Sequence, residues 1–228
     1  MDTKKRYCTF PICLLKDVTP DNISDKLIYV IEYCLFVHTL NYSADDKSNQ
    51  IKAAGKYLGF NSRNPSDSYD RGKRTYSLMP AKYPKVSISV TMITDFHRNH
   101  KTEFELVCFL MFAAIRSILQ KKPYCRVTNE YLISRMHGNA SQNEDKTNMI
   151  LYPYNNRYQL EKIKKELSDH WGLKYFGKYT RGFYVSFDLE YNKLVFEVEK
   201  KRKSYLDKLR KDKEAEAIRE ARNILYNQ

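Results

Sequence analysis

Glycine and paired cysteines are scarce in this chain of 228 residues, and their scarcity excludes several kinds of site. Seven glycines in total form no phosphate-cradling loop, so a glycine-rich nucleotide site is not expected. The five cysteines are odd in number and include no Cys-x-x-Cys pair, which argues against a disulfide framework and a zinc site. Free thiols suit a reducing compartment, and we expect a cytoplasmic protein. The cysteines are Cys8, Cys13, Cys34, Cys108 and Cys125.

Long hydrophobic runs are also missing. The apolar run Leu106–Ile115 has only ten residues, whereas a helix that crosses a bilayer needs about 20. The first residues, Met1–Arg6, are polar, and only a short apolar run follows, so no signal peptide is expected. We therefore expect no membrane partner and interpret Leu106–Ile115 as a buried helix.

Positive charge is what the chain has in excess. Lys and Arg number 40 against 27 Asp and Glu, which gives a formal net charge of +13. At 42% hydrophobic residues the chain has enough apolar material for a core, so it is not compositionally disordered. The excess indicates an anionic partner, with nucleic acid first and a membrane surface second. A basic protein without a special partner remains the alternative.

The second half of the sequence predicts three helices followed by a hairpin. Thr102 and Glu105 form a capping box ahead of an apolar helix that runs to Leu119. Thr128 is placed to cap a short second helix that ends at Gly138. A polar loop leads to a basic third helix and then to two short strands. The expected ranges are helices 102–119, 129–136 and 155–171 and strands 173–176 and 183–189.

This order resembles a winged-helix DNA-binding domain, in the stretch from Tyr154 to Val185 above all. The basic helix would turn an apolar stripe inward, consisting of Leu160, Ile163, Leu167 and Trp171. A major groove admits one such helix, and side chains near its start reach base edges. The resemblance further implies that the hairpin tip lies along the phosphate backbone. The candidate contacts are Asn155, Asn156, Arg157, Tyr158, Gln159, Lys162 and Lys165 on the helix, and Lys178 and Arg181 on the hairpin.

The first half predicts helices and one strand around a weaker basic patch. Thr19 and Pro20 predict the start of a helix that runs towards Leu40, and Ser48 predicts the cap of a second helix that ends at Gly59. Residues 61–72 are rich in Asn, Ser and Asp and are expected to be irregular, and residues 85–92 alternate as in a strand. Basic side chains with tyrosines between them can contact nucleic acid. The patch contains Arg63, Arg71, Lys73 and Arg74, with Tyr69 and Tyr76 nearby.

The two halves are weakly alike at an offset of roughly eighty residues, longer than the periods of solenoid repeats. A second winged-helix-like unit in the first half would resemble plasmid-type replication initiators, which carry tandem winged helices. The alternative is two unrelated helical segments, and no long recognition helix is expected between Gly59 and Val86. We divide the chain into residues 1–95, 96–190 and a charged helical tail, 191–228, which could help the chain form a homodimer.

The sequence therefore predicts a mainly helical α+β protein that binds double-stranded DNA without being an enzyme. Its expected role is replication initiation on a plasmid or other mobile element, or transcriptional regulation, and we expect no cofactor and no metal. An assembly or scaffold module that uses the tail helix is the second hypothesis. The third is a metal-dependent nuclease, because His97 and His100 lie three residues apart in a compact polar stretch.

Overall fold

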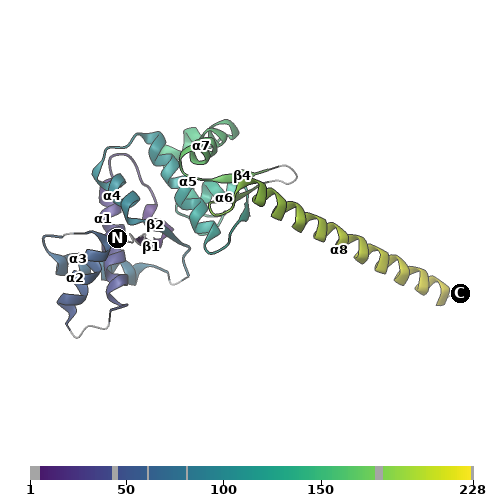
Figure 1. Cartoon of the computed structure of the whole chain (residues 1–228), viewed down its shortest axis with the longest axis horizontal. Helices are drawn as coiled ribbons and strands as arrows, with labels where there is room; N and C mark the ends of the chain where they lie inside the picture. Colours follow the sequence, from purple (N-terminus) through teal and green to yellow (C-terminus); the bar gives the residue numbers. More distant parts are fainter. Residues whose placement is uncertain (1–5, 43–45, 61, 81, 178–181, 227–228) are drawn as a thin grey trace.

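The computed structural model describes residues 6–42, 46–60, 62–80, 82–177 and 182–226. Within them the chain is α+β and mainly helical, with two small antiparallel sheets. The elements gather into two adjoining lobes, and one long C-terminal helix projects away from them (Figure 1).

The N-terminal lobe combines four helices with a two-stranded sheet. In it β1 (Tyr7–Pro11) pairs antiparallel with β2 (Lys85–Ser89), so that Phe10 faces Val86 across the ladder. Between these strands the chain forms the 3-10 helix η1 and three α-helices, and α4 follows β2. Their bounds are η1 Ile12–Leu15, α1 Ile23–Thr39, α2 Lys47–Leu58, α3 Pro65–Leu78 and α4 Val90–Arg98.

The C-terminal lobe contains a three-stranded antiparallel sheet in the order β3-β5-β4 and the helices that precede it. The central strand pairs on both sides, so Tyr184 lies opposite Arg126 on one neighbour and Phe176 on the other. The elements are α5 Glu103–Leu119, β3 Cys125–Val127, α6 Asn129–Met136, η2 Met149–Tyr154, α7 Arg157–His170, β4 Lys174–Phe176 and β5 Phe183–Ser186.

Helix α5 forms the centre of the protein. Its capping box is present, because the Thr102 side chain accepts from the Glu105 backbone and the Glu105 carboxylate accepts from Thr102. Every residue from Leu106 to Ile115 is buried, as expected of the apolar run. The buried core around α5 takes in apolar residues from both lobes, so the hydrophobic core is continuous across residue 95.

Two predicted helix starts in the N-terminal lobe are wrong. Helix α1 begins at Ile23 and not at Thr19, because the Asn22 side chain accepts from the Thr19 backbone at 2.8 Å and closes a turn ahead of the helix. Helix α2 is capped by Asp46, whose side chain accepts from the Ser48 backbone, and not by Ser48. Its predicted end is confirmed, since Gly59 has the left-handed backbone with φ of 62°.

The prediction that residues 61–72 are irregular is wrong from residue 65 onwards, and a helix lies in the stretch before Val86 where no long recognition helix was expected. Helix α3 begins at Pro65, a residue favoured at the first helical position, and continues for 14 residues. Its small residues Ser68 and Gly72 are buried against α1, so tertiary packing outweighs the weak helix propensity of the segment. The predicted strand at 85–92 is shorter than expected, because the Ser89 side chain caps α4.

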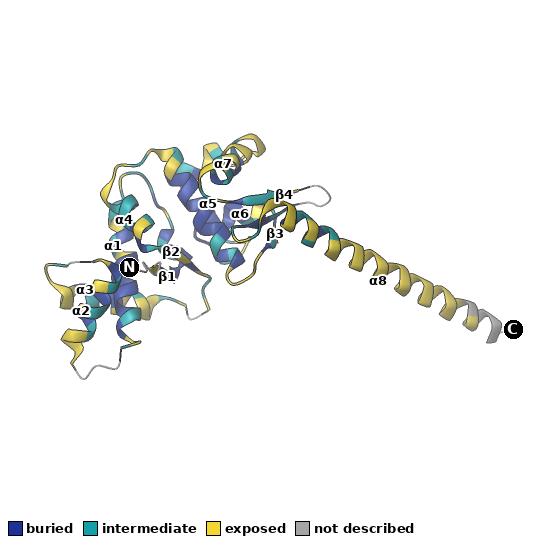
Figure 2. Cartoon of the chain, viewed as in Figure 1, coloured by how far each residue is buried: buried dark blue, intermediate teal, exposed yellow. Residues whose placement is uncertain are grey.

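The C-terminal helix α8 (Tyr191–Tyr226) is anchored only at its start. Leu194 and Val198 are buried beside Tyr124 in a small second core. Beyond them the described residues are almost all exposed, and the helix extends into solvent (Figure 2). No helix in the described part of the chain combines the length and apolar character needed to cross a membrane.

Candidate nucleic-acid interface

The start of α7 is fixed by a side-chain cap. Asn156 accepts a hydrogen bond from the Gln159 backbone at 2.9 Å, and its amide nitrogen donates to the carbonyl of Pro153 at 3.0 Å. Among the predicted DNA contacts, Asn156 therefore already has a structural role, since its side chain satisfies an otherwise unpaired helix N–H. Asn155 and Arg157 are exposed beside it, and Gln159 is half-buried.

The inner face of α7 agrees with the predicted apolar stripe. Leu160, Ile163 and Leu167 are buried in the main core, where α7 packs against α5. Trp171 is half-buried just after the helix, with its ring 5.3 Å from that of Phe112. This packing fixes which side of α7 is turned outward.

The outer face of α7 presents aromatic and basic side chains to solvent. Tyr158 is 77% exposed, and Lys162 and Lys165 are exposed one and two turns further along. The Lys162 ammonium lies 4.9 Å from the centre of the Phe104 ring, a contact that positions its charge beside α5. The predicted outward set from α7 therefore lies together on one accessible surface, which could follow a polyanion.

Lys164 is a buried cation that the sequence analysis did not identify. Its side chain is 3% exposed, and Nζ donates to Glu161 at 2.8 Å and to Asn129 at 3.2 Å. The same ammonium lies 3.8 Å from the centre of the Phe183 ring. Burial lowers the pKa of Lys164, and the Glu161 carboxylate partly opposes that shift. The burial of Lys164 could have been predicted from its position, because residue 164 is one turn beyond Leu160 on the inner side of the helix.

The segment between α6 and α7 is held by polar contacts that also join the lobes. Helix α6 has the predicted Thr128 cap. Beyond it, the Glu144 carboxylate accepts from the backbones of Ala140 and Ser141, and these bonds hold the pKa of Glu144 below its usual value despite partial burial. The Tyr83 hydroxyl of the N-terminal lobe donates to the carbonyl of Gly138 at 2.9 Å. The Tyr83 contact ties the segment that leads towards α7 to the N-terminal lobe.

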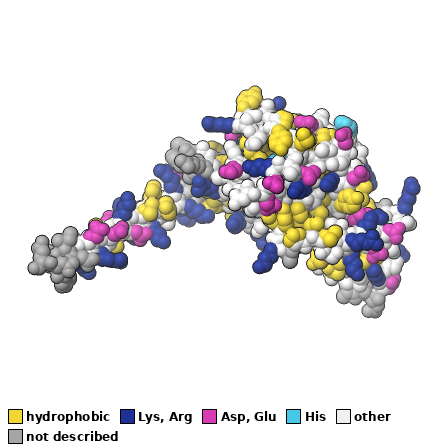
Figure 3. Space-filling view, turned by 180° about the vertical axis from the view of Figure 1, so that it is seen from behind, with side chains coloured by type: hydrophobic (Ala, Val, Ile, Leu, Met, Phe, Trp, Pro, Cys, Tyr) yellow, Lys and Arg dark blue, Asp and Glu magenta, His cyan; other side chains and the backbone are white. Residues whose placement is uncertain are grey.

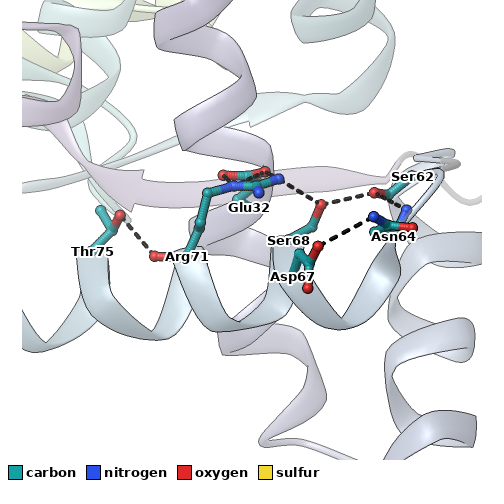
Figure 4. Close-up of polar contacts among 7 residues, drawn as sticks. All are labelled: Glu32, Ser62, Asn64, Asp67, Ser68, Arg71 and Thr75. Atoms are coloured by element: carbon teal, nitrogen blue, oxygen red, sulfur yellow. Dashed lines mark hydrogen bonds and ion pairs between the residues drawn. The ribbon is translucent and has the colours of Figure 1, made fainter.

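In the N-terminal lobe, the basic patch divides into a paired and an exposed part. Arg71 donates from Nε and Nη2 to the buried carboxylate of Glu32 and also reaches the Ser68 hydroxyl (Figure 4). Arg71 is nevertheless half exposed, and Lys73 and Arg74 on α3 and Arg63 just before it are exposed as well. The two tyrosines of the patch pack against α1. The centre of the Phe36 ring lies 5.3 Å from that of the Tyr69 ring and 5.1 Å from that of the Tyr76 ring.

Lys178 and Arg181 lie outside the described residues, although β4 and β5 on either side of them pair as the predicted hairpin requires. His97 lies on α4, where its Nδ1 is 2.9 Å from the Ser24 hydroxyl. Throughout the described ranges, no cluster of three or more His, Cys, Asp or Glu side chains is arranged to hold a metal ion.

Exposed basic side chains therefore occur on two separate elements, the outer face of α7 and helix α3. Their cations belong to different lobes that share one core. Comparison with known proteins gives no family for this arrangement: no protein-family model, no curated protein and no solved structure matches the chain.

Proposed function

We propose that this protein binds double-stranded DNA in a sequence-specific way through a winged-helix unit that contains α5, α6, α7 and the sheet β3-β5-β4. The observation that carries the proposal is the two-sided character of α7. Its apolar stripe is buried against α5, and its opposite face exposes Tyr158, Lys162 and Lys165. A helix held in this way can enter a major groove without losing its packing.

The order of elements supports the same proposal. A capped helix, a short strand, a second helix, the basic helix and an antiparallel hairpin follow one another along the chain. The winged-helix resemblance implies this order, with the hairpin beside the recognition helix. With 14 residues and a rise of about 1.5 Å per residue, α7 is about 21 Å long, which suits contact along one face of a duplex.

A second unit of the same kind in the N-terminal lobe is favoured by α3. This helix occupies the segment where the sequence predicted no recognition helix, follows α2, and leads into β2. It exposes Lys73 and Arg74, whereas Arg71 is held by Glu32. We therefore propose tandem DNA-contacting units, as in plasmid-type replication initiators. Replication initiation and transcriptional regulation would use the same surfaces, so fold does not choose between them.

The test is a titration of duplex DNA with variants of the outer face of α7. The double variant Lys162→Ala, Lys165→Ala should weaken binding and lower the salt dependence by about one unit of slope for each lost phosphate contact. The double variant Lys73→Ala, Arg74→Ala tests the second unit, and it should weaken binding and lower the salt dependence in the same way. Fluorescence anisotropy at several salt concentrations measures both quantities.

A matched control comes from Lys213→Ala, which removes an exposed lysine from α8, outside both proposed DNA-contacting units. It should leave the affinity and the salt slope close to those of the parent chain. If the α7 double variant behaves like this control, the proposed docking of α7 is wrong.

An assembly or scaffold role is the second candidate, and the exposed length of α8 favours it. A helix with so little packing of its own is suited to contact a partner, including a second copy of this chain. Gel shifts separate the two candidates. A scaffold should bind native-locus and random DNA equally, weakly and only at low salt, whereas a sequence-specific protein should prefer the native locus.

A further inference from the structure

A groove of about 660 Å³ lies between the sheet of the C-terminal lobe and the part of α8 that leaves it. It is separate from the outer face of α7, which contributes none of its lining. Its floor comes from the strands, and its wall comes from α8. Figure 3 shows Lys and Arg side chains gathered along this part of the helix.

The floor of the groove is a row of side chains set by strand register. Arg126 of β3 lies opposite Tyr184 of β5, and Tyr184 lies opposite Phe176 of β4. Directly paired residues point to the same face of a sheet, so one basic and two aromatic side chains stand in line. Tyr184 and Phe176 are half-buried, which leaves part of each ring accessible from the groove.

The wall of the groove is one side of α8. Val198 is buried against the sheet, and Lys201, Tyr205 and Lys208 follow it at spacings of three, seven and ten residues, which keeps them on the same side of the helix. Tyr205 is 62% exposed. With Arg126 and Arg202 the lining contains four basic side chains and, among its described residues, no carboxylate, although Glu199, just outside the lining, lies 3.6 Å from Arg202.

We infer that this groove binds single-stranded nucleic acid, with bases stacked on its aromatic rings and phosphates held by its lysines and arginines. Base–aromatic stacking contributes to binding regardless of sequence, and basic side chains follow the backbone. A duplex fits this groove poorly, because its bases are already stacked on one another. A second copy of this chain is also disfavoured as the occupant, since it would bring the same positive segment of α8 against this one.

The inference deepens the proposed function, since it adds a second site and a second form of nucleic acid to it. The experiment therefore measures binding of a labelled oligothymidylate of about 12 nucleotides, within the usual site size, and of a labelled duplex in parallel. Tyr205→Ala should weaken binding of the single strand by about 5- to 150-fold, the range that corresponds to loss of one stacked base. Tyr205→Phe keeps the ring and should retain binding.

The double variant Lys201→Ala, Lys208→Ala should weaken binding of the single strand and reduce the salt dependence of that binding. Single strands also release counterions when their phosphates are neutralised. The matched control is Tyr29→Ala, which removes a tyrosine of similar exposure, 50%, from α1 in the other lobe. This control should bind the single strand as the parent chain does. The α7 double variant Lys162→Ala, Lys165→Ala should weaken duplex binding and keep single-strand binding.

The outcomes distinguish the two proposals. If Tyr205→Ala binds the single strand as tightly as Tyr29→Ala while duplex binding is intact, the groove inference is overturned and the proposed function stands. Equal weakening of duplex and single-strand binding in the α7 double variant would also overturn it, since one surface would then bind both. A dimer measured by light scattering that Tyr205→Ala dissociates, with single-strand binding unchanged, would assign the groove to a second copy instead.

Discussion

Arg71 and Glu32 form a forked ion pair that joins α3 to α1. Nε of Arg71 lies 2.9 and 3.1 Å from the two carboxylate oxygens, and Nη2 lies 2.5 Å from one of them. The Glu32 side chain is 1% exposed, whereas that of Arg71 is 50% exposed. The guanidinium therefore covers a buried carboxylate, and the ion pair has a structural role.

Arg71→Ala is expected to lower the free energy of unfolding by about 1–3 kcal/mol, because it leaves a buried carboxylate without its main partner. The loss is smaller than the value for a fully buried pair, since water reaches the half-exposed arginine side. Arg71→Lys should recover part of the loss, as lysine supplies the charge but not the fork. Urea unfolding measures these differences.

The control for this series is Asp70→Ala, an exposed neighbour on α3, which should change stability by no more than about 0.5 kcal/mol. Equal stability of Arg71→Ala and Asp70→Ala would show that the pair does not hold α3. The sequence predicted that Arg71 contacts DNA. Measuring duplex binding by the folded Arg71→Lys variant tests that prediction separately from stability.

Gly72 directly follows Arg71 on α3 and allows α1 and α3 to lie close together. A Cβ at this position would lie 2.0 Å from the carbonyl oxygen of Glu32 and 3.2 Å from Cβ of Phe36. The nearest atom belongs to the helix backbone, so side-chain rotation cannot relieve the contact and the two helices must separate. Separation would also lengthen the Arg71–Glu32 contact.

Gly72→Ala is therefore expected to destabilise the protein by about 1–3 kcal/mol or more, even though alanine favours a helix by about 1 kcal/mol. Thermal and urea unfolding would both shift, and Asp70→Ala again serves as the exposed control on the same helix. A stability gain in Gly72→Ala would mean that helix propensity dominates and that α3 can move away from α1 at little cost.

The helices that the sequence predicted correctly are those whose signals are local. The Thr102–Glu105 capping box and the apolar run behind it lie within one helix, and the stripe of α7 repeats at helical spacing. Both kinds of signal involve residues a few positions apart, so they can be identified without knowing what packs against the helix.

The elements that the sequence could not predict depend on distant residues. Helix α3 is rich in weak helix formers, and its packing depends on a glycine that lies against a carbonyl group of α1. Arg71 was predicted as a DNA contact from its basic and aromatic neighbours, and its ion pair with Glu32 could not be predicted because the two residues are 39 positions apart. The groove beside α8 likewise needs the register of three strands and the direction of a helix, neither of which composition or periodicity contains.

His137 links the end of α6 to the junction of the lobes. Its Nδ1 accepts from the Asn148 backbone at 3.0 Å, and the Asn148 side chain donates to the carbonyl of Val18 at 3.0 Å. Burial lowers the pKa of His137, with Lys146 and Lys16 acting in the same direction and Asp17 against it. A protonated Nδ1 could no longer accept the bond from Asn148, so the folded junction requires the neutral ring.

Because the folded pKa of His137 lies below its unfolded value near 6.5, its stabilisation is present above about pH 6.5 and is lost as pH falls towards the folded pKa. In that interval the unfolded chain binds the extra proton, and this histidine contributes a slope of at most about 1.4 kcal/mol per pH unit. His137→Asn keeps an acceptor near Nδ1 but does not titrate, so its unfolding free energy should fall less steeply below pH 6.5 than that of the parent chain. Urea unfolding between pH 5 and pH 8 measures both slopes, and comparison of the two chains cancels the contributions of His38 and the carboxylates. Parallel slopes in the two chains would show that His137 does not couple the junction to pH.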